Sequence, residues 1–378
     1  MFALSALRAV ALGGRMPRTL LAALFAPLFA LLSLIAPHAH AQSALDRANF
    51  DSLDVAIYWY GANNVNQRAV PGQFNPFFNP ARPTVIYMHG WQPNTVQSLS
   101  RETFNRSELN SNGDVARPWI DRGWNVGIFY WNQYADEGEV KDAEAKIYTA
   151  AGPRQMRWRN AAGNYTAGPA QSVTAQFISV YRAAMSGYTG NQVRLVGHSL
   201  GAQLAINSAT ELLRLFNAGS LPANQTPLRV ALLDAAFLNG ARDYLGGKWP
   251  GEVARDNVSA NRGTLSYEYY RTSGATSNGF IGDTNQGLID MVTMTEIKPW
   301  YFNAFEIDKK HRMAPGWYFE SMSTSVKVKC TGRPALSASL DNATLRSYAN
   351  AATKFEQLDG KYTRGVSDDT FDQKGDGC

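Results

Sequence analysis

A strand-like run, a Gly-x-Ser-x-Gly turn and a helix-like run follow directly on one another near the middle of the chain. Residues 193–196 are rich in branched apolar side chains and predict a buried strand, while residues 202–215 contain few helix breakers and predict a helix. Reversing the chain within one turn strains the central residue, Ser199, and Gly197 and Gly201 prevent clashes around it. Such a turn leaves the Ser199 hydroxyl exposed at its tip.

This turn predicts a nucleophile elbow, in which a strained serine attacks an acyl group. Leu200 begins the predicted helix, so its backbone amide points toward the position where an oxyanion would form. The pentapeptide alone is a weak signal, because the chain contains 32 glycines. The flanking strand and helix strengthen it, and a glycine-rich turn without chemistry stays open as the alternative.

Residues 1–41 have the pattern of a secretory signal peptide. Three arginines precede an apolar run at residues 20–36, and small residues at positions 39 and 41 allow cleavage after Ala41. A retained membrane anchor is the alternative, but Pro27 interrupts the apolar run and no stop-transfer charges follow it. We therefore expect a secreted protein, extracellular or periplasmic, without a stable transmembrane segment.

Residues 42–378 are long enough for one large domain with a full core, or for one domain with a small appendage. We divide them into a catalytic domain at residues 42–335 and a C-terminal extension at residues 336–378, whose polar sequence predicts a solvated tail. The formal charge is +5 for the whole chain and +2 without the signal peptide, which gives no support for a nucleic-acid partner.

The only two cysteines, Cys330 and Cys378, both lie near the C-terminus. In an oxidising compartment, a disulfide between them would fasten the end of the chain to the strand-like residues 326–329. Two unpaired thiols are the alternative.

Apolar segments along the chain alternate with helical stretches, which predicts a mostly parallel central sheet with helices on both faces. Residues 132–168 are polar with scattered aromatics and predict an excursion from the sheet, and residues 240–263 predict loops. The predicted strands are residues 54–60, 83–88, 124–130, 228–233 and 265–270, and residues 171–185 predict a helix.

A serine needs a base, and the five histidines of the chain can be sorted by elimination. His38 and His40 leave with the signal peptide. His198 precedes the nucleophile, and its side chain should point away from it. His89 ends another strand at a His-Gly pair, where the backbone matters more than the ring. His311, in a loop-like stretch, therefore remains as the base, and an exposed histidine without a role is its alternative.

The acid that orients this base should follow a sheet strand. Asp234 ends the apolar run at residues 228–233 and fits this position, with Asp283 and Asp290 as reserves and a simple turn cap as the alternative. A second oxyanion donor should follow an earlier strand. The Trp91 amide, after Gly90, provides it.

Four stretches together resemble the pancreatic-type lipase family, whose members have the α/β-hydrolase fold. Residues 85–91 resemble its oxyanion strand, and residues 193–202 resemble its nucleophile segment. Residues 232–236 resemble its acid segment, and residues 311–321 resemble its histidine segment. The resemblance implies a triad of Ser199, Asp234 and His311, with oxyanion donors at Trp91 and Leu200 and a mobile lid at residues 276–305.

The resemblance implies a triacylglycerol lipase that acts through an acyl-enzyme on a lipid or ester substrate, with a lipid–water interface as a candidate partner. Phospholipase A1 and a short-chain or polyester esterase stay open as alternatives, as does a non-catalytic ligand-binding protein on a hydrolase scaffold. We expect no cofactor. A structural calcium ion stays open as the alternative, but residues 252–256 keep only part of the calcium loop of the family and its spacing is broken.

Overall fold

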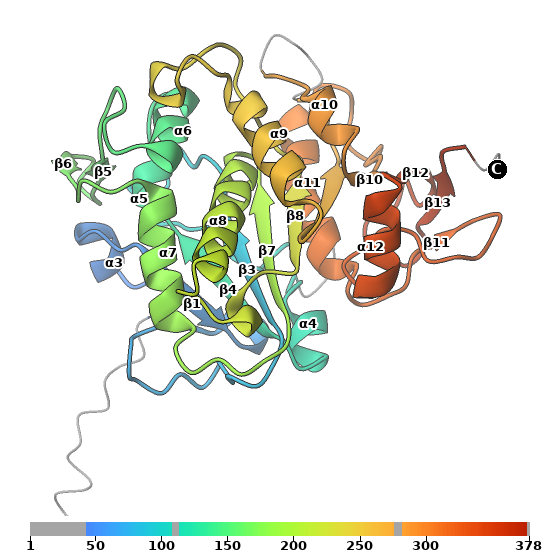
Figure 1. Cartoon of the computed structure of the whole chain (residues 1–378), viewed down its shortest axis with the longest axis horizontal. Coiled ribbons are helices and arrows are strands. Elements are labelled where there is room, and N and C mark those ends of the chain that lie inside the picture. The colour runs from blue at the N-terminus through green and yellow to red at the C-terminus, as the bar shows by residue number, and fades with distance from the viewer. Residues whose placement is uncertain (1–42, 108–112, 276–281, 376–378) are drawn as a thin grey trace, which may run out of the picture. The chain divides into compact units, whose positions relative to one another are not determined.

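An eleven-stranded sheet runs through the described part of the chain (Figure 1). The structure is a computed structural model that describes residues 43–107, 113–275 and 282–375. The strands of the sheet are β1 (Ala56–Tyr60), β2 (Asn66–Arg68), β3 (Thr84–Met88), β4 (Asn125–Tyr130), β7 (Val193–His198), β8 (Arg229–Leu233), β9 (Ser266–Arg271), β10 (Thr293–Glu296), β11 (Lys327–Val328), β12 (Lys354–Asp359) and β13 (Thr370–Gln373).

Helices connect most of these strands, and a separate hairpin stands apart from the sheet. The helices are α3 (Ala48–Asp51), α4 (Arg117–Asp121), α5 (Asn132–Ala135), α6 (Val140–Tyr148), α7 (Val173–Ala184), α8 (Leu200–Asn217), α9 (Pro250–Asn261), α10 (Gln286–Ile289), α11 (Ile307–Glu320) and α12 (Asn342–Asn350). The hairpin consists of β5 (Arg157–Arg159) and β6 (Tyr165–Ala167). Within the described ranges, no helix combines the length and hydropathy that crossing a bilayer requires.

The order of the strands is β11-β13-β12-β10-β9-β8-β7-β3-β4-β1-β2. Strands β4, β3, β7, β8, β9, β10 and β12 are parallel, whereas β1 and β2 are antiparallel at one edge. After β3 the chain moves outward to β4, and after β7 it moves the other way to β8. The carboxyl ends of β3 and β7 therefore flank a topological switch point, where open α/β sheets place their ligands.

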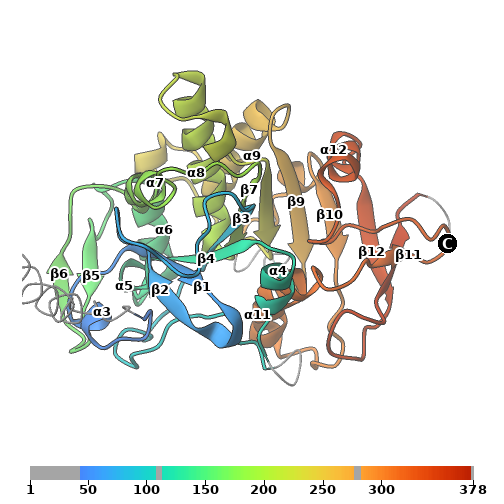
Figure 2. The same ribbon diagram turned by 90° about the horizontal axis from the view of Figure 1, so that it is seen from below.

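Two apolar layers cover the sheet, because alternate residues of each strand point to opposite faces. Ile86 and Leu195 pack in one core with α7, α8 and α9. Val85 and Val196 pack in the other core with α4 and α11. Figure 2 shows these two groups of helices on opposite sides of the sheet. The parallel sheet, its covering helices and the strand–turn–helix elbow after β7 give the chain an α/β-hydrolase fold, as the sequence predicted.

The predicted strands are confirmed as β1, β3, β4, β8 and β9, and the predicted helix at residues 171–185 is confirmed as α7. The excursion at residues 132–168 contains α5, α6 and the β5–β6 hairpin. The prediction of loops at residues 240–263 is wrong, because α9 occupies half of this segment. Its start is stabilised by Pro250 in the first turn and by Glu252, whose carboxylate accepts a hydrogen bond of 2.7 Å from the Trp249 amide.

The interpretation of residues from 336 onward as a solvated tail is also wrong. Strand β12 pairs in parallel with β10, so this segment extends the central sheet, and β13 pairs with β12. Phe355 and Phe371 are buried in the same core as α11. These strands were missed because they place few apolar side chains inward between polar ones. Cys378 and the predicted signal peptide lie outside the described residues, so the Cys330–Cys378 disulfide stays a prediction.

A buried ion pair joins β8, β9 and α11. The Glu268 carboxylate is fully buried and accepts hydrogen bonds from the Arg229 guanidinium at 2.7 and 3.1 Å. It also accepts hydrogen bonds from the Tyr270 and Tyr318 hydroxyls at 2.8 and 3.2 Å. All four lone-pair directions of the carboxylate are thus used, and helix α11 is fixed to the sheet through Tyr318.

Removing this carboxylate should cost much more stability than removing a surface carboxylate. We expect Glu268→Ala to lower the free energy of unfolding by about 3–5 kcal/mol, because Arg229 is left buried and unpaired. Glu211→Ala is the matched control: its ion pair with Arg214 is exposed and should contribute about 0–1 kcal/mol. Urea denaturation measures both values, and equal losses would contradict the structural role of the buried pair.

Asp369 links the C-terminal segment to α11. One of its carboxylate oxygens accepts a hydrogen bond of 2.6 Å from the Trp317 indole of α11, and the other accepts a bond of 2.8 Å from the Gln357 amide of β12. Burial raises the pKa of Asp369 from 3.8 to about 7. The folded protein therefore holds this proton at a higher pH than the unfolded chain.

This raised pKa predicts a stability that depends on pH. The contribution of the protonated carboxyl is complete below its unfolded pKa of 3.8 and is lost as the pH rises through about 7. Asp369→Asn cannot ionise and should lack this decline. Urea denaturation of both proteins at pH 5 and pH 8 measures it: the wild type should lose more stability than the variant, and parallel losses would contradict the assignment.

Candidate active site

Ser199 occupies a strained turn between β7 and α8. Its backbone angles are φ 56° and ψ −124°, which a non-glycine residue rarely adopts. A Cβ atom on Gly197 would lie 2.1 Å from the Gly201 carbonyl oxygen, and one on Gly201 would lie 2.1 Å from the Met88 carbonyl oxygen. Both positions therefore require glycine, and the elbow can form only because the backbones approach so closely.

Backbone hydrogen bonds fix this turn to the end of β8. The Ser199 amide donates to the Leu233 carbonyl at 3.0 Å, and the Ala236 amide donates to the Ser199 carbonyl at 3.2 Å. Asp234 and Ala235 lie between these two contacts. The elbow and the predicted acid are therefore held side by side by the main chain, independently of any side chain.

Asp234 is fully buried and has a positive φ of 41°. One of its carboxylate oxygens accepts hydrogen bonds from the amides of Thr272 and Ser273 at 3.2 and 3.3 Å. The other accepts from the Ser273 hydroxyl and from Nδ1 of His311, the latter at 2.6 Å. The structure thus brings Asp234 and His311 together, whereas the reserve residues Asp283 and Asp290 bond to other partners.

Thr272 and Ser273 are the site residues that sequence reasoning missed. Both follow β9, whose Tyr270 is in register with Leu233 of β8, so the residues after the two strands are neighbours. The order of the strands carried this information, but the sequence alone did not show that β8 and β9 are adjacent. The two amides and the hydroxyl fix the position of the Asp234 carboxylate.

His311 lies in helix α11, not in the loop that the sequence predicted. The hydrogen bond of its Nδ1 to Asp234 leaves Nε2 for a reacting group, and 20% of its side chain is exposed. Within the described ranges, the Ser199 hydroxyl donates no hydrogen bond to this ring in the structure without substrate. Catalytic hydrogen bonds of this kind commonly tighten only when the substrate binds.

His198 positions the helix that carries His311. The Nε2–H group of His198 donates to the His311 carbonyl at 3.1 Å, and the two rings pack with their centroids 4.5 Å apart. Pro315 explains why this carbonyl is available: it lies four residues further along α11 and has no amide to donate to it. Burial and the charge of His311 lower the pKa of His198 to about 3, so it stays neutral.

The candidate oxyanion loop follows β3 and lies against the nucleophile. A Cβ atom on Gly90 would lie 2.7 Å from the Cβ of Ser199, so only glycine fits. Nδ1 of His89 lies 2.9 Å from the Gly90 carbonyl. In a trans peptide the carbonyl and the next amide point in opposite directions. Holding the Gly90 carbonyl on the His89 side thus turns the Trp91 amide away from it.

His89 is fully buried, and its tautomer follows from its partners. Its Nε2 accepts a hydrogen bond from the Trp131 amide at 3.2 Å, so Nδ1 must carry the proton that is donated to Gly90. Burial lowers the pKa of His89 to about 4, which keeps this arrangement at neutral pH. The Trp91 indole donates to the Glu137 carbonyl at 2.8 Å and anchors the other end of the loop.

Part of the predicted lid segment belongs to the central sheet. Residues 276–281 of that segment lie outside the described residues. Residues 293–296 form β10, which pairs with both β9 and β12, so the interpretation of the whole segment as a lid is wrong. Among the described residues, no group of three His, Cys, Asp or Glu side chains is arranged to hold a metal ion.

Comparisons with known proteins find only remote likenesses to solved structures. No family model matches the chain, and no curated protein matches its sequence. Esterase 2 of Thermogutta terrifontis, solved phosphonylated by cyclosarin, is 12% identical with a TM-score of 0.35, over 74% of this chain and 92% of that chain. A poly(3-hydroxybutyrate) depolymerase from Bordetella parapertussis is 14% identical with a TM-score of 0.27, over 73% and 82% of the two chains. Scores this low carry no inference about activity.

The contact between His198 and His311 predicts a positioning effect. We expect His198→Phe, which keeps a ring but loses the donor, to lower kcat on a soluble ester about 3- to 10-fold, the range for one neutral hydrogen bond. His198→Gln can place an amide N–H near the same position and should recover part of the loss. Ester-hydrolysis kinetics with a parallel thermal melt measure this, and a loss in stability without a change in kcat would contradict the role.

Proposed function

We propose that the protein is a secreted serine hydrolase of carboxylic esters, and most specifically a triacylglycerol lipase. One observation carries the hydrolase proposal. The buried Asp234 carboxylate accepts a hydrogen bond from His311, and this pair lies beside the strained, glycine-flanked Ser199. Oδ2 of Asp234 and Nδ1 of His311 are 2.6 Å apart. The Ser199 backbone is hydrogen-bonded to Leu233 and Ala236, which lie on either side of Asp234 in the sequence. This is the set of roles that nucleophilic acyl transfer requires.

In the proposed mechanism, Nε2 of His311 accepts the Ser199 proton as Oγ attacks the ester carbonyl carbon. The carbonyl oxygen becomes an oxyanion that accepts hydrogen bonds from the amides of Trp91 and Leu200. The first turn of a helix leaves amides such as that of Leu200 without a partner in the helix. His311 then gives its proton to the departing alcohol, and water releases the acyl group by the same steps.

Asp234 fixes the tautomer and the orientation of the imidazole. A carboxylate can only accept, so Nδ1 of His311 must carry a proton and Nε2 must be the basic nitrogen. The three donors hold the carboxylate in place against the imidazole. None of these steps needs a cofactor, so we propose that turnover is independent of added metal.

The choice of a triacylglycerol lipase is supported by the four stretches that resemble the pancreatic-type lipase family. Phospholipase A1 and a short-chain or polyester esterase remain the alternatives among enzymes. Tributyrin, phosphatidylcholine and soluble esters, assayed side by side, distinguish these three. A binding protein on the same scaffold would have no need of the Asp234–His311 bond and the strained serine together, which favours an enzyme.

The proposal predicts loss of all ester turnover on removing one hydroxyl. Ser199→Ala should reduce p-nitrophenyl butyrate hydrolysis at least about 1,000-fold and abolish fluorophosphonate labelling, because a triad acts as a unit. Ser220→Ala, at an exposed serine, is the matched control and should keep both. The assay contains EDTA. Retained labelling in Ser199→Ala, or a requirement for calcium in the wild type, would contradict the corresponding part of the proposal.

A further inference from the structure

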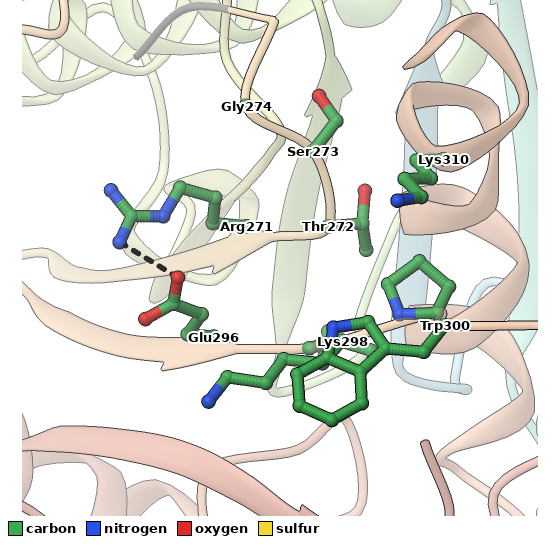
Figure 3. Close-up of a pocket in the computed structure, with 10 residues that line it drawn as sticks. Arg271, Thr272, Ser273, Gly274, Glu296, Lys298, Trp300 and Lys310 are labelled. Atoms are coloured by element: carbon green, nitrogen blue, oxygen red, sulfur yellow. Dashed lines mark hydrogen bonds and ion pairs between the residues drawn. The ribbon is translucent and has the colours of Figure 1, made fainter. Parts of the chain in front are cut away.

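A cavity of about 260 Å³ lies next to the residues that hold Asp234 (Figure 3). Its walls come from the ends of β9 and β10, from the segment after β10 and from α11. Thr272 and Ser273, whose amides bond to Asp234, line it on one side. Lys310, the residue before His311, lines it on another. The cavity thus borders the candidate active site without containing the nucleophile.

The Thr272 hydroxyl is an unsatisfied polar group in this wall. Thr272 is 4% exposed, and its Oγ1 forms no hydrogen bond with any part of the chain that the structure describes. Leaving a buried hydroxyl without a partner costs free energy that folding normally avoids. A group in the cavity that accepts or shares a hydrogen bond would remove this cost.

Lys310 supplies an unpaired positive charge to the same cavity. No acidic residue in the described ranges lies within ion-pair distance of it, whereas the neighbouring Lys309 pairs with Glu306. Figure 3 shows the end of the Lys310 side chain turned toward the Thr272 hydroxyl. The two groups therefore offer a charged donor and a neutral hydroxyl to one small ligand group.

The remaining charges of the lining favour an anion. Glu296 is the only acid among the lining residues, and it is matched by Arg271 at 3.0 Å and by Lys374 at 3.8 Å. Lys298 adds a further positive charge to the lining and pairs with Glu356. Together the lining residues carry three cations and one acid.

Trp300 forms the mouth of the cavity and is 46% exposed. The ammonium groups of Lys298 and Lys361 lie 5.6 and 4.6 Å from its ring centre. Two cations over the indole give this part of the cavity a positive potential, which favours an anionic group. The opening thus suits an ester with an acidic end better than a wholly neutral one.

We propose that this cavity binds an oxyanion carried by the substrate, a carboxylate or a phosphate, through Lys310 and the Thr272 hydroxyl. The inference rests on the proposed serine ester hydrolysis and not on the choice of a triacylglycerol lipase. It selects esters with an anionic group away from the scissile bond, which triacylglycerols lack. The proposed anion site also adjoins Asp234. An anion bound by the Thr272 hydroxyl would lie next to the segment after β9, whose Thr272 and Ser273 amides donate hydrogen bonds to Asp234.

Two matched pairs of esters test this. p-Nitrophenyl hexanoate and the p-nitrophenyl monoester of adipic acid share a scissile bond and differ by one carboxylate. Tributyrin and dibutyryl glycerol 3-phosphate provide the corresponding phosphate arm. In the wild type, the anionic member of at least one pair should have the higher kcat/KM. In Lys310→Gln, the anionic-to-neutral ratio should fall about 10- to 100-fold, the range for a charge-assisted hydrogen bond.

Lys309→Gln is the control, because it removes an adjacent charge that is already paired, and it should keep the wild-type ratio. Thr272→Val removes only the hydroxyl and keeps the amide that bonds to Asp234. It should lower the same ratio while leaving the urea midpoint unchanged or raised, since an unsatisfied buried hydroxyl is lost. A purely structural role for Thr272 would lower the midpoint instead.

Phosphate binding by the Ser199→Ala variant separates this inference from the proposed function. Isothermal titration with inorganic phosphate should give heat of binding in Ser199→Ala and much less in the double variant with Lys310→Gln. Absence of all ester turnover with retained phosphate binding would overturn the proposed function alone. Turnover of neutral esters with equal ratios in wild type, Lys310→Gln and Lys309→Gln would overturn the anion site alone.

Discussion

The close approach of three backbone segments at the switch point of the sheet is the constraint on which the site depends. Gly201 lies against the end of β3, Gly90 lies against Ser199, and Gly197 lies against the first turn of α8. A methyl group at any of these positions would clash with the facing segment. The strained serine and the candidate oxyanion loop therefore meet because Gly90 has no side chain where Ser199 lies against it.

A second set of contacts places the base. Helix α11 is fixed to the sheet by Tyr318 on Glu268 and to the C-terminal segment by Trp317 on Asp369. His198 holds its first turns through the carbonyl that Pro315 leaves without a helical partner. A proline in the middle of a helix normally costs stability. Here the His311 carbonyl accepts a hydrogen bond from the buried His198 ring. Pro315 therefore weakens the helix but allows a contact that fixes the position of His311.

The strands and the elbow were predictable because their signals are local: an apolar run, a glycine pair and a following helix. The element that carries His311 was not, because Pro315 and Gly316 resemble loop residues by propensity, while the buried Trp317 and Phe319 make the helix favourable only after it packs on the sheet. The donors to Asp234 were missed for a related reason. Their place depends on which strands are neighbours, and strand order is not encoded in any short stretch.

Three histidines lie in the described residues, and the fold gives them different chemistry. Burial lowers the pKa of His89 to about 4 and that of His198 to about 3. The N–H group of each ring donates a hydrogen bond to a backbone carbonyl. Neither can accept a proton near neutral pH without losing a structural hydrogen bond or charging a buried group. His311 alone combines partial exposure with a carboxylate on Nδ1. For this reason the proposed mechanism assigns the transfer of the Ser199 proton to His311 and not to His89 or His198.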